Sequence, residues 1–316
     1  MKAVVVGEFG GPEQLRLAEV ADPVPGPGQF RVAVHAAGVN PVDAGNRADG
    51  TWAGLTAPCI LGYDIAGVVE SAGPGVTALA PGDRVMAMTH FRDGAGGYAE
   101  LAVVEAGLVA PIGPAVSFSA AAAAPLAAGT AHDLLARLAL PAGGSLLVLG
   151  GSGGVGLFVL QLAAAAGIMT IGVGRQARHE QMLSLGASFC IDYTREDVAR
   201  RAVMLAGGRV DAIADLVGGT LAQTVLAALR PGGQVAAIAV PVLDLDPILD
   251  ENITFHGVLI QDDGDRTRRL AALLADGTLR PVVRDVLPLA AAADAHRIVE
   301  SGHAGGKIVL DVTGAS

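Results

Sequence analysis

The pattern of hydrophobic and polar positions changes once along the chain, near Phe118. Before that residue, short apolar stretches alternate with polar positions and are separated by Gly and Pro, as in FRVAVHAAGV, AGVVESAGPGV and GYAELAVV. Short alternating runs bounded by turn residues are typical of strands, and their spacing predicts a partly open antiparallel barrel. We expect no long amphipathic helix in this part of the chain.

After Phe118, short apolar strands alternate with Ala-rich helical stretches. This alternation predicts right-handed strand–helix–strand crossovers and a parallel sheet. A further strand (ITFHGVLI), a helix at about 266–275 and a last strand (GKIVLDV) follow them. The expected strands of the alternating series span 145–150, 168–173, 189–192, 210–215 and 233–240, and the expected helices span about 154–166, 177–185, 195–206 and 220–229.

The third helix of this series carries signals at both of its ends. TRED at 194–197 has the Thr-x-x-acid spacing of a capping box, which predicts Thr194 as the N-terminal cap. Gly207 stands where the helix should stop, because glycine readily adopts the left-handed conformation that ends helices.

Length, charge and cysteine content narrow the class of protein. The 316 residues suit about two domains, and 21 basic against 31 acidic side chains give a formal charge of −10. An acidic chain disfavours nucleic acid or an anionic membrane as a partner. Cys59 and Cys190 lie far apart, so we expect two buried, unpaired thiols rather than a disulfide framework. Neither a signal peptide nor a membrane span is recognisable, and the expected location is the cytoplasm.

A cluster of glycines directly follows the strand SLLVLG and precedes a helix. Within it, Gly151, Gly153 and Gly156 fill a G-x-G-x-x-G motif. The first glycine permits the tight turn, the second lets the backbone approach a pyrophosphate, and the third lets helix and strand pack closely. The alternative is a turn that only packs the helix on the sheet. We predict a dinucleotide site whose backbone groups come from Gly151, Ser152, Gly153, Gly154, Val155 and Gly156.

The residues after the second strand of the series indicate which dinucleotide is bound. An NAD site usually places Asp or Glu about 20 residues beyond the motif, where it binds the ribose 2′-hydroxyl. No acidic residue occurs from Gly167 to His179, whereas Arg175 follows Gly174 directly and Arg178 is close behind. Guanidinium groups match the geometry of a phosphate, which favours NADP over NAD. The alternative is that both arginines lie on a solvated helix face.

Short motifs run through nearly the whole chain: AAGVNPVDAGNR, LGYDIAGVVESAGPGV, PGDRV and GGYAE, then PLAAGTA, LGGSGGVG, IDY and DLVGG, and finally GGKIVL. Their order and spacing resemble the zinc-free quinone oxidoreductase (zeta-crystallin-like) branch of the medium-chain dehydrogenase/reductase superfamily. The resemblance implies an α/β fold. Residues 1–117 and 276–316 would form a GroES-like catalytic domain, and residues 118–275 a Rossmann domain with a doubly wound parallel sheet that binds NADP.

Two positions depart from the zinc-dependent relatives of that superfamily. Where those enzymes carry a Cys and the His of a GHE motif, this chain has Asn40 and Tyr63, and the four-cysteine lobe of a structural zinc is absent. Zinc requires thiolate, imidazole or carboxylate ligands in a tetrahedral set, and Asp64 alone does not supply one. We therefore expect no bound metal and no zinc alcohol dehydrogenase activity.

Hydride transfer without a metal needs an acceptor that is already electrophilic, such as a quinone or an α,β-unsaturated carbonyl. The resemblance places Asn40, Asp43 and Tyr63 near the nicotinamide as candidate catalytic residues. Asn40 would bind a carbonyl or the nicotinamide ribose, Asp43 would orient its loop, and Tyr63 would donate to the developing oxyanion. Alternatively, Asp43 only caps a turn and Tyr63 only packs. His90 and Phe91 are candidates for the lining of the substrate pocket.

The resemblance also implies cofactor contacts in other segments. Thr130 would contact the nicotinamide end, and Tyr193 would border the adenosine or its 2′-phosphate. Lys307 in the returning tail would reach the cofactor, or would be a solvated lysine before the last strand. Ligands bind at the carboxyl ends of parallel strands, which adds four residues at the ends of the fourth and fifth strands: Val217, Gly218, Ala239 and Val240.

The expected function is NADPH-dependent transfer of hydride to a small quinone or enone. ITFHGVLI resembles an edge strand that pairs with its copy in this family, which predicts a homodimer. Two alternatives stay open. An enoyl-thioester reductase would favour a basic rim, but the first domain offers only Arg47, Arg84 and Arg92. A non-catalytic NADPH-binding sensor or structural protein would carry the same glycine loop.

Overall fold

The computed structural model describes residues 1–91, 96–302 and 304–314. It divides into two compact units. The first unit comprises Met1–Gly129 and Gln261–Ser316, and the second comprises Thr130–Ile260.

The first unit is built on two sheets. The larger has the strand order β15-β16-β3-β5-β6-β8 with β7 paired to β3, and the smaller has the order β2-β1-β4. Among these described strands every pair is antiparallel except β15 with β16, which confirms the predicted antiparallel class. The strands are β1 (Lys2–Val6), β2 (Leu15–Glu19), β3 (Gln29–Val39), β4 (Cys59–Ile60), β5 (Asp64–Ala72), β6 (Arg84–Met88), β7 (Leu101–Glu105), β8 (Val109–Pro111), β15 (Val283–Pro288) and β16 (Lys307–Asp311).

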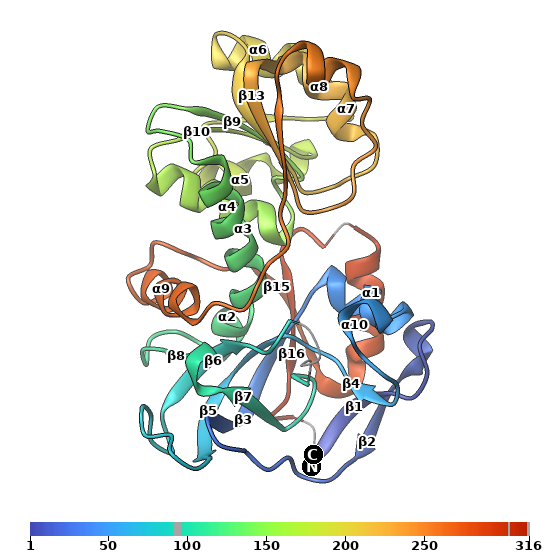
Figure 1. The fold of residues 1–316 in the computed structure, drawn as a ribbon, viewed down its shortest axis with the longest axis vertical. Coiled ribbons are helices and arrows are strands. Elements are labelled where there is room, and N and C mark those ends of the chain that lie inside the picture. Colours follow the sequence, from blue (N-terminus) through green and yellow to red (C-terminus); the bar gives the residue numbers. More distant parts are fainter. Residues whose placement is uncertain (92–95, 303, 315–316) are drawn as a thin grey trace. The chain divides into compact units, whose positions relative to one another are not determined.

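The C-terminal part of the chain returns to the sheet of this unit. The last strand, β16, pairs antiparallel with β3, so that Ile308 lies opposite Val39, and Figure 1 shows this red strand beside the blue one. The helices of the unit are α1 (Pro41–Ala48), α2 (Phe118–Ala122), α9 (Gly264–Ala275) and α10 (Ala292–Glu300), with single 3-10 turns at Pro12–Gln14, Thr51–Ala53, Ala106–Leu108 and Leu289–Ala291. Helix α3 (Pro125–Leu138) begins in the first unit and continues into the second.

The expected domain boundaries, after residues 117 and 275, differ from the limits of the two units. Helix α2 packs on β3 and β5, and α9 packs on β6 and β8. Both helices therefore belong with the strands of the first unit. The sequence pattern predicts where helices occur. The unit to which a helix belongs depends on the sheet against which it packs.

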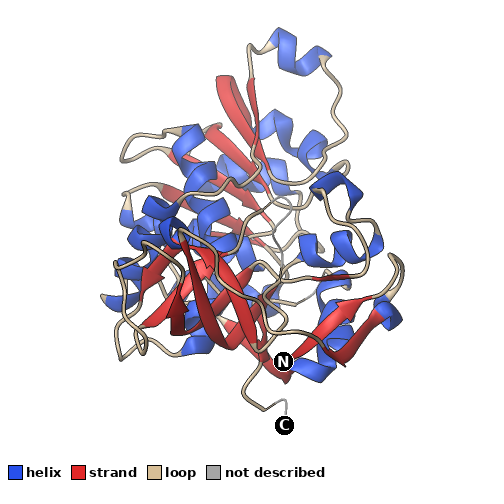
Figure 2. Ribbon diagram, turned by 60° about the horizontal axis from the view of Figure 1, so that its bottom comes forward, coloured by secondary structure: helices blue, strands red, loops and turns tan. Residues whose placement is uncertain are grey.

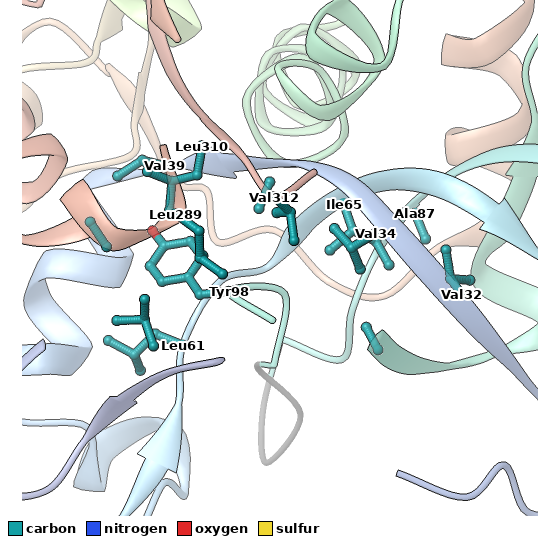
Figure 3. Close-up of a cluster of buried hydrophobic side chains, with 14 of the residues drawn as sticks. Val32, Val34, Val39, Leu61, Ile65, Ala87, Tyr98, Leu289, Leu310 and Val312 are labelled. Atoms are coloured by element: carbon teal, nitrogen blue, oxygen red, sulfur yellow. The ribbon is translucent and has the colours of Figure 1, made fainter. Parts of the chain in front are cut away.

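Alternate residues of β3 and β5 form the centre of the first unit's core. Along β3 the burial alternates up to residue 36, as the period of a strand requires. Figure 3 shows Val32, Val34 and Ile65 in one buried cluster with Leu310 of β16 and the ring of Tyr98. The returning tail thus completes this core.

The second unit contains a parallel six-stranded sheet with the order β11-β10-β9-β12-β13-β14. Strand β9 is buried at every residue, as expected for a parallel strand covered on both faces; Figure 2 shows the red strands among blue helices. The strands are β9 (Ser145–Leu149), β10 (Met169–Val173), β11 (Phe189–Ile191), β12 (Val210–Asp215), β13 (Leu229–Ala237) and β14 (Thr254–Gly257). The helices are α4 (Gly154–Ala165), α5 (His179–Ser184), α6 (Val198–Ala206), α7 (Leu221–Val225) and α8 (Asp246–Asp250), with 3-10 turns at Gln176–Arg178 and Leu226–Ala228.

This sheet confirms the predicted Rossmann class, but two local predictions are wrong. Strand β13 begins at Leu229 rather than at residue 233, because the preceding helix stops early in a 3-10 turn. Helix α6 is capped by Asp197, whose carboxylate accepts the N–H of Arg200. Thr194 is not the cap, since its hydroxyl donates to Asp192 instead. Gly207 ends α6 in the left-handed conformation, as expected.

The two cysteines differ from the expectation of full burial. Cys59 and Cys190 are free thiols, and each is only partly buried. Cys59 lies in the two-residue strand β4, and Cys190 lies in β11 at the edge of the sheet. Both strands lie at the edge of their sheet, where fewer neighbours cover a side chain. None of the described helices is long and apolar enough to cross a membrane.

Candidate functional site

The glycine loop of the second unit connects β9 to α4 and is held by close backbone contacts. Gly150 has a φ of +78°, which favours glycine. A Cβ on Gly156 would lie 2.3 Å from the carbonyl oxygen of Gly150, and a Cβ on Gly151 would lie 3.1 Å from the Cα of Gly172 in β10. Gly153 is the N-cap of α4. The loop therefore packs helix and strands closely and leaves the first N–H groups of the helix for a ligand.

The end of the neighbouring strand β10 brings together several predicted residues. The Arg175 Nε donates to the hydroxyl of Tyr193 at 3.1 Å, and both side chains are exposed. A Cβ on Gly174 would lie 3.1 Å from the Oγ of Ser152, so this strand end adjoins the glycine loop. Arg178 lies one 3-10 turn further on, with its N–H bound to the carbonyl of Arg175.

The segments after β12 and β13 meet beside the same loop. A Cβ on Gly150 would lie 3.0 Å from Val217, and a Cβ on Gly218 would lie 2.8 Å from the carbonyl oxygen of Val240 and 3.0 Å from Ala239. These residues lie two or three positions beyond their strands, rather than in the last positions that the sequence predicted. Val217 and Val240 are 53% and 87% exposed, so both are accessible to a ligand.

Asp215 fixes one of these segments and was missed by the sequence prediction. It is fully buried at the end of β12, and its Oδ1 accepts the N–H groups of Val217 and Gly218, each at 3.0 Å. An acid at the end of an apolar strand, two residues before a VGG turn, is the signal that would have identified it. Thr130, also predicted as a cofactor contact, is buried on α3 in the second unit.

The predicted catalytic residues of the first unit lie in a buried polar cluster. Asn40 and Asp43 stand at the start of α1, where the Asp43 Oδ2 accepts the backbone N–H of Asn40 at 2.8 Å. The Asn40 amide donates to Asp64 Oδ2 at 3.0 Å, and its Oδ1 accepts from the Lys307 ammonium. Lys307 also donates to the carbonyl of Val39 at 3.2 Å and lies 3.5 Å from Asp64.

Lys307 is 4% exposed, so the alternative of a solvated lysine is wrong. Its ammonium binds Asn40 and Asp64 of its own unit, because β16 begins at Lys307 and its first residues pair with the end of β3, directly before α1. Asp64 was discounted in the sequence as an insufficient zinc ligand. It instead links three segments, since its Oδ1 also accepts the N–H of Leu126 at 2.7 Å.

Burial dominates the titration of this cluster. It raises the pKa of Asp43 to about 7, with the Asn40 N–H acting in the opposite direction. Burial also raises the pKa of Asp64 and lowers the pKa of Lys307, and the attraction between these two opposes both changes. A low dielectric disfavours each isolated charge, so the carboxylate and the ammonium depend on each other.

Tyr63 is fully buried, and its hydroxyl accepts a hydrogen bond of 2.6 Å from the Asn46 amide. Its ring stacks on Phe91, with ring centroids 5.2 Å apart, and Phe91 meets the exposed Trp52 edge-on at 6.0 Å. Burial raises the pKa of Tyr63, so the hydroxyl keeps its proton at neutral pH. His90 is half-exposed and binds Asp262 at 2.6 Å, which places it on the surface of the unit.

Among the described residues, no group of three or more His, Cys, Asp and Glu side chains is arranged to hold a metal ion. The positions discussed for catalytic zinc hold Asn40 and Tyr63, and both take part in the hydrogen bonds described above. The ammonium of Lys307 already supplies a positive charge beside Asp64.

Two family models match separate parts of the chain. Residues 26–114 match the model of the alcohol dehydrogenase GroES-like domain, and residues 185–310 match the zinc-binding dehydrogenase model. The chain is 33% identical to a quinone oxidoreductase of Rattus norvegicus, over 98% of this chain and 97% of the relative. It is 32% identical to a chloroplastic NADPH-dependent alkenal/one oxidoreductase of Arabidopsis thaliana, over 98% of this chain and 79% of the relative.

A solved structure shows the same likeness in three dimensions. The Escherichia coli quinone oxidoreductase complexed with NADPH superimposes with a TM-score of 0.90 at 27% identity, covering 99% of this chain and 100% of the other. The chain thus matches the rat quinone oxidoreductase in sequence and the Escherichia coli quinone oxidoreductase in fold, over nearly the full length of each. The chain therefore belongs to the medium-chain dehydrogenase/reductase superfamily and is a homologue of the quinone oxidoreductases.

Proposed function

We propose that this protein is an NADPH-dependent, zinc-independent reductase of quinones or α,β-unsaturated carbonyls. The observation that carries the proposal is the glycine loop after β9 with Arg175 and Tyr193 beside it at the neighbouring strand ends. The relatives named quinone oxidoreductase and alkenal/one oxidoreductase support the same chemistry.

The residues of the loop fit a dinucleotide. A side chain at Gly156 would collide with backbone atoms, and one at Gly151 would crowd the Cα of Gly172, so the loop keeps its backbone bare where a pyrophosphate would lie against the start of α4. Arg175 is exposed beside the loop, and the planar, charged guanidinium group suits a 2′-phosphate. The backbone beyond β12 and β13 would flank the nicotinamide half, with Val217 and Val240 as contacts.

When bound, NADPH supplies a hydride from C4 of its nicotinamide, and one proton completes the two-electron reduction of the acceptor. In the first unit we assign the Tyr63 hydroxyl as donor to the developing oxyanion. Asn46 donates to its oxygen, which leaves the Tyr63 hydrogen for another acceptor. Asn40 would bind the acceptor carbonyl or the nicotinamide ribose, and Asp43 would hold the Asn40 backbone.

The donor set around Asn40 supports the proposed zinc independence. An amide and a phenol are poor zinc ligands, and a divalent cation here would face the buried ammonium of Lys307. A metal is not needed to polarise a quinone or enone, because hydrogen bonds are sufficient to stabilise the negative oxygen that forms on reduction.

A panel of acceptors tests the proposal through the loss of NADPH absorbance. The acceptors are 1,4-benzoquinone, 9,10-phenanthrenequinone, a simple alkenal and crotonyl-CoA, each with NADPH, with NADH and with a chelator. We expect turnover of a quinone or the alkenal with NADPH that the chelator does not reduce. Turnover of crotonyl-CoA alone would identify a thioester reductase, and NADPH binding without turnover of any acceptor would favour a sensor.

Arg175→Ala tests the choice of cofactor. Losing charge-assisted hydrogen bonds to a phosphate should raise the KM for NADPH about 10- to 100-fold and leave the KM for NADH within about twofold. Arg200→Ala on α6, an exposed arginine away from the loop, is the matched control. Equal loss with both cofactors would contradict the assignment of Arg175 to the 2′-phosphate.

We further propose a homodimer formed through β14. This strand ends the six-stranded sheet, and Phe255 on it is 39% exposed. An edge strand that exposes an aromatic side chain favours pairing with a second copy. Phe255→Lys should halve the mass seen by light scattering, whereas Leu17→Lys on β2 should not; a wild-type protein of monomer mass would refute the dimer.

The two free thiols suit a reducing compartment such as the cytoplasm.

A further inference from the structure

Asp262 is a carboxylate of the first unit that the proposed reaction does not use. It directly precedes Asp263, the N-cap of helix α9, whose own carboxylate accepts the N–H of Arg266 at 2.9 Å. The guanidinium of Arg266 is buried and donates to the carbonyl of Gln261 on the other side of Asp262. Helix α9 in turn packs on β6 and β8. The Asp262 side chain therefore extends from a backbone segment that is held at both ends.

Both oxygens of this carboxylate bind the segment that follows β6. The Asp262 Oδ1 accepts the backbone N–H of Phe91 at 3.0 Å, and its Oδ2 lies 2.6 Å from Nδ1 of His90. Because a carboxylate offers only acceptors, Nδ1 of His90 carries the hydrogen of this contact. Hydrogen bonds to a charged acceptor are stronger than those between neutral groups. Two of them at neighbouring residues fix the backbone at Phe91.

The same segment is also joined to Tyr63. The N–H of Thr89 donates to the carbonyl oxygen of Tyr63 at 2.8 Å. Two positions later, the Phe91 ring stacks on the Tyr63 ring, with centroids 5.2 Å apart and an angle of 27° between the planes. Phe91 is only 4% exposed, so its ring is enclosed. Since the backbone at Phe91 is fixed and side chains occupy few staggered rotamers, Asp262 limits the positions that this ring can take.

The plane of the Tyr63 ring determines where its hydroxyl can donate, because the O–H bond of a phenol prefers to lie in the plane of the ring. The amide of Asn46 binds the hydroxyl oxygen at 2.6 Å and fixes the end of the side chain. A single hydrogen bond at the oxygen leaves the ring free to turn about its long axis. The stacked ring of Phe91 opposes that turn, because the two faces must stay nearly parallel.

We propose that Asp262 is a positioning residue, which holds Phe91 against the Tyr63 ring and so fixes the plane in which the Tyr63 hydroxyl donates. This inference rests on the proposed function, because Tyr63 is assigned there as donor to the developing oxyanion. Asp262 acts through Phe91, 171 residues away in the chain, rather than through contact with the acceptor. The segment that leads into α9 thus contributes to the geometry of a residue at the start of β5.

Nuclear magnetic resonance tests these contacts without any substrate. Asp262→Ala removes the acceptor of the Phe91 N–H, so this amide should exchange its hydrogen faster and the ring signals of Tyr63 should move. Asp262→Asn keeps an acceptor oxygen and should retain most of the protection. Asp265→Ala is the matched control, since this exposed carboxylate in the first turn of α9 pairs with Arg268. Unchanged exchange at Phe91, or unmoved Tyr63 signals, in Asp262→Ala would overturn the proposal.

The fluorescence of Trp52 provides a second readout. Trp52 is the chain's single tryptophan, and its ring meets Phe91 edge-on with centroids 6.0 Å apart. If Asp262→Ala releases Phe91, Trp52 loses an apolar neighbour and its emission should move to longer wavelengths. Phe91→Leu removes the aromatic ring directly and should give a shift in the same direction, whereas Asp265→Ala should give none. Wild-type emission in Asp262→Ala would show that Asp262 does not hold Phe91.

Kinetics separates positioning from a contribution to folding alone. We expect Asp262→Ala to lower kcat about tenfold, since small displacements of positioning groups strongly reduce rates. Binding of NADPH should stay within about twofold, because the glycine loop is in the second unit. Asp262→Asn should recover most of kcat, and Asp265→Ala should keep the wild-type value. A folded Asp262→Ala protein with wild-type kcat would refute the positioning role.

The readouts keep this inference separate from the proposed function. If the wild-type protein oxidises NADPH with no acceptor of the panel, the proposed function fails. The exchange of the Phe91 amide and the emission of Trp52 then still decide whether Asp262 holds Phe91 against Tyr63. If Asp262→Ala does not fold, the Phe91 amide of the wild-type protein decides: slow exchange supports the hydrogen bond to Asp262, and fast exchange overturns it.

Discussion

The candidate residues of the two units differ in their exposure to solvent. In the second unit they are backbone groups of glycines and exposed side chains such as Arg175 and Val240. In the first unit they are side chains with almost no exposure, including Asp43, Asp64 and Lys307. A glycine loop binds a ligand only if no side chain blocks its backbone, whereas a buried charge is stable only beside an opposite charge or a hydrogen-bond partner. Substitutions should therefore damage ligand binding in the second unit and stability in the first.

The largest effect on stability should come from Lys307→Met. The variant leaves the Asp64 carboxylate buried without its ammonium, which costs about 3–5 kcal/mol when one partner of a buried pair is lost. Urea unfolding followed by the fluorescence of Trp52, the chain's single tryptophan and a residue of the first unit, measures it. Lys2→Met on β1 is the control. An unchanged unfolding midpoint would show that Asp64 and Lys307 do not depend on each other.

The buried Asp43 should make the first unit less stable as pH rises. Its pKa is raised to about 7 in the folded state, so between pH 4 and 7 the folded protein holds a proton that the unfolded chain has lost. Stability then falls across this window by up to about 4 kcal/mol. Asp43→Asn keeps an acceptor for the Asn40 N–H but does not titrate. The wild-type protein should lose stability relative to this variant from pH 4 to 7, and parallel curves would contradict the raised pKa.

Gly156→Ala should have a smaller effect, in the second unit. Its Cβ would lie 2.3 Å from the carbonyl oxygen of Gly150, so the loop must shift. We expect the Kd for NADPH to rise about 10- to 100-fold, or about 1.4–2.8 kcal/mol. Gly208→Ala, where nothing lies within 4 Å of the added carbon, should leave the Kd unchanged. The Trp52 unfolding curve should stay the same in both variants; its shift in Gly156→Ala would break the contrast between the units.

The local sequence pattern was sufficient to predict most helices and strands, but it did not predict the residues at which they begin and end. Alternation of strands and helices predicted the parallel sheet, and the glycine spacing predicted the loop that the structure shows after β9. The helix cap was misassigned, because Thr194 and Asp197 both suit a cap and only the path of the chain decides between them. The domain boundary was displaced because α9 resembles its neighbours in sequence but packs on β8.

The sequence by itself determined the two-part α/β organisation, the bare glycine backbone, the arginine after β10 and the absence of Cys and His at the positions discussed for zinc. These features depend on residue types within a few positions of one another. The tertiary structure alone decided that Lys307 binds Asn40, 267 residues away, and that His296 meets Tyr98, 198 residues away. Such contacts arise because buried charges and polar groups must find partners, and the partner is whichever segment the fold brings beside them.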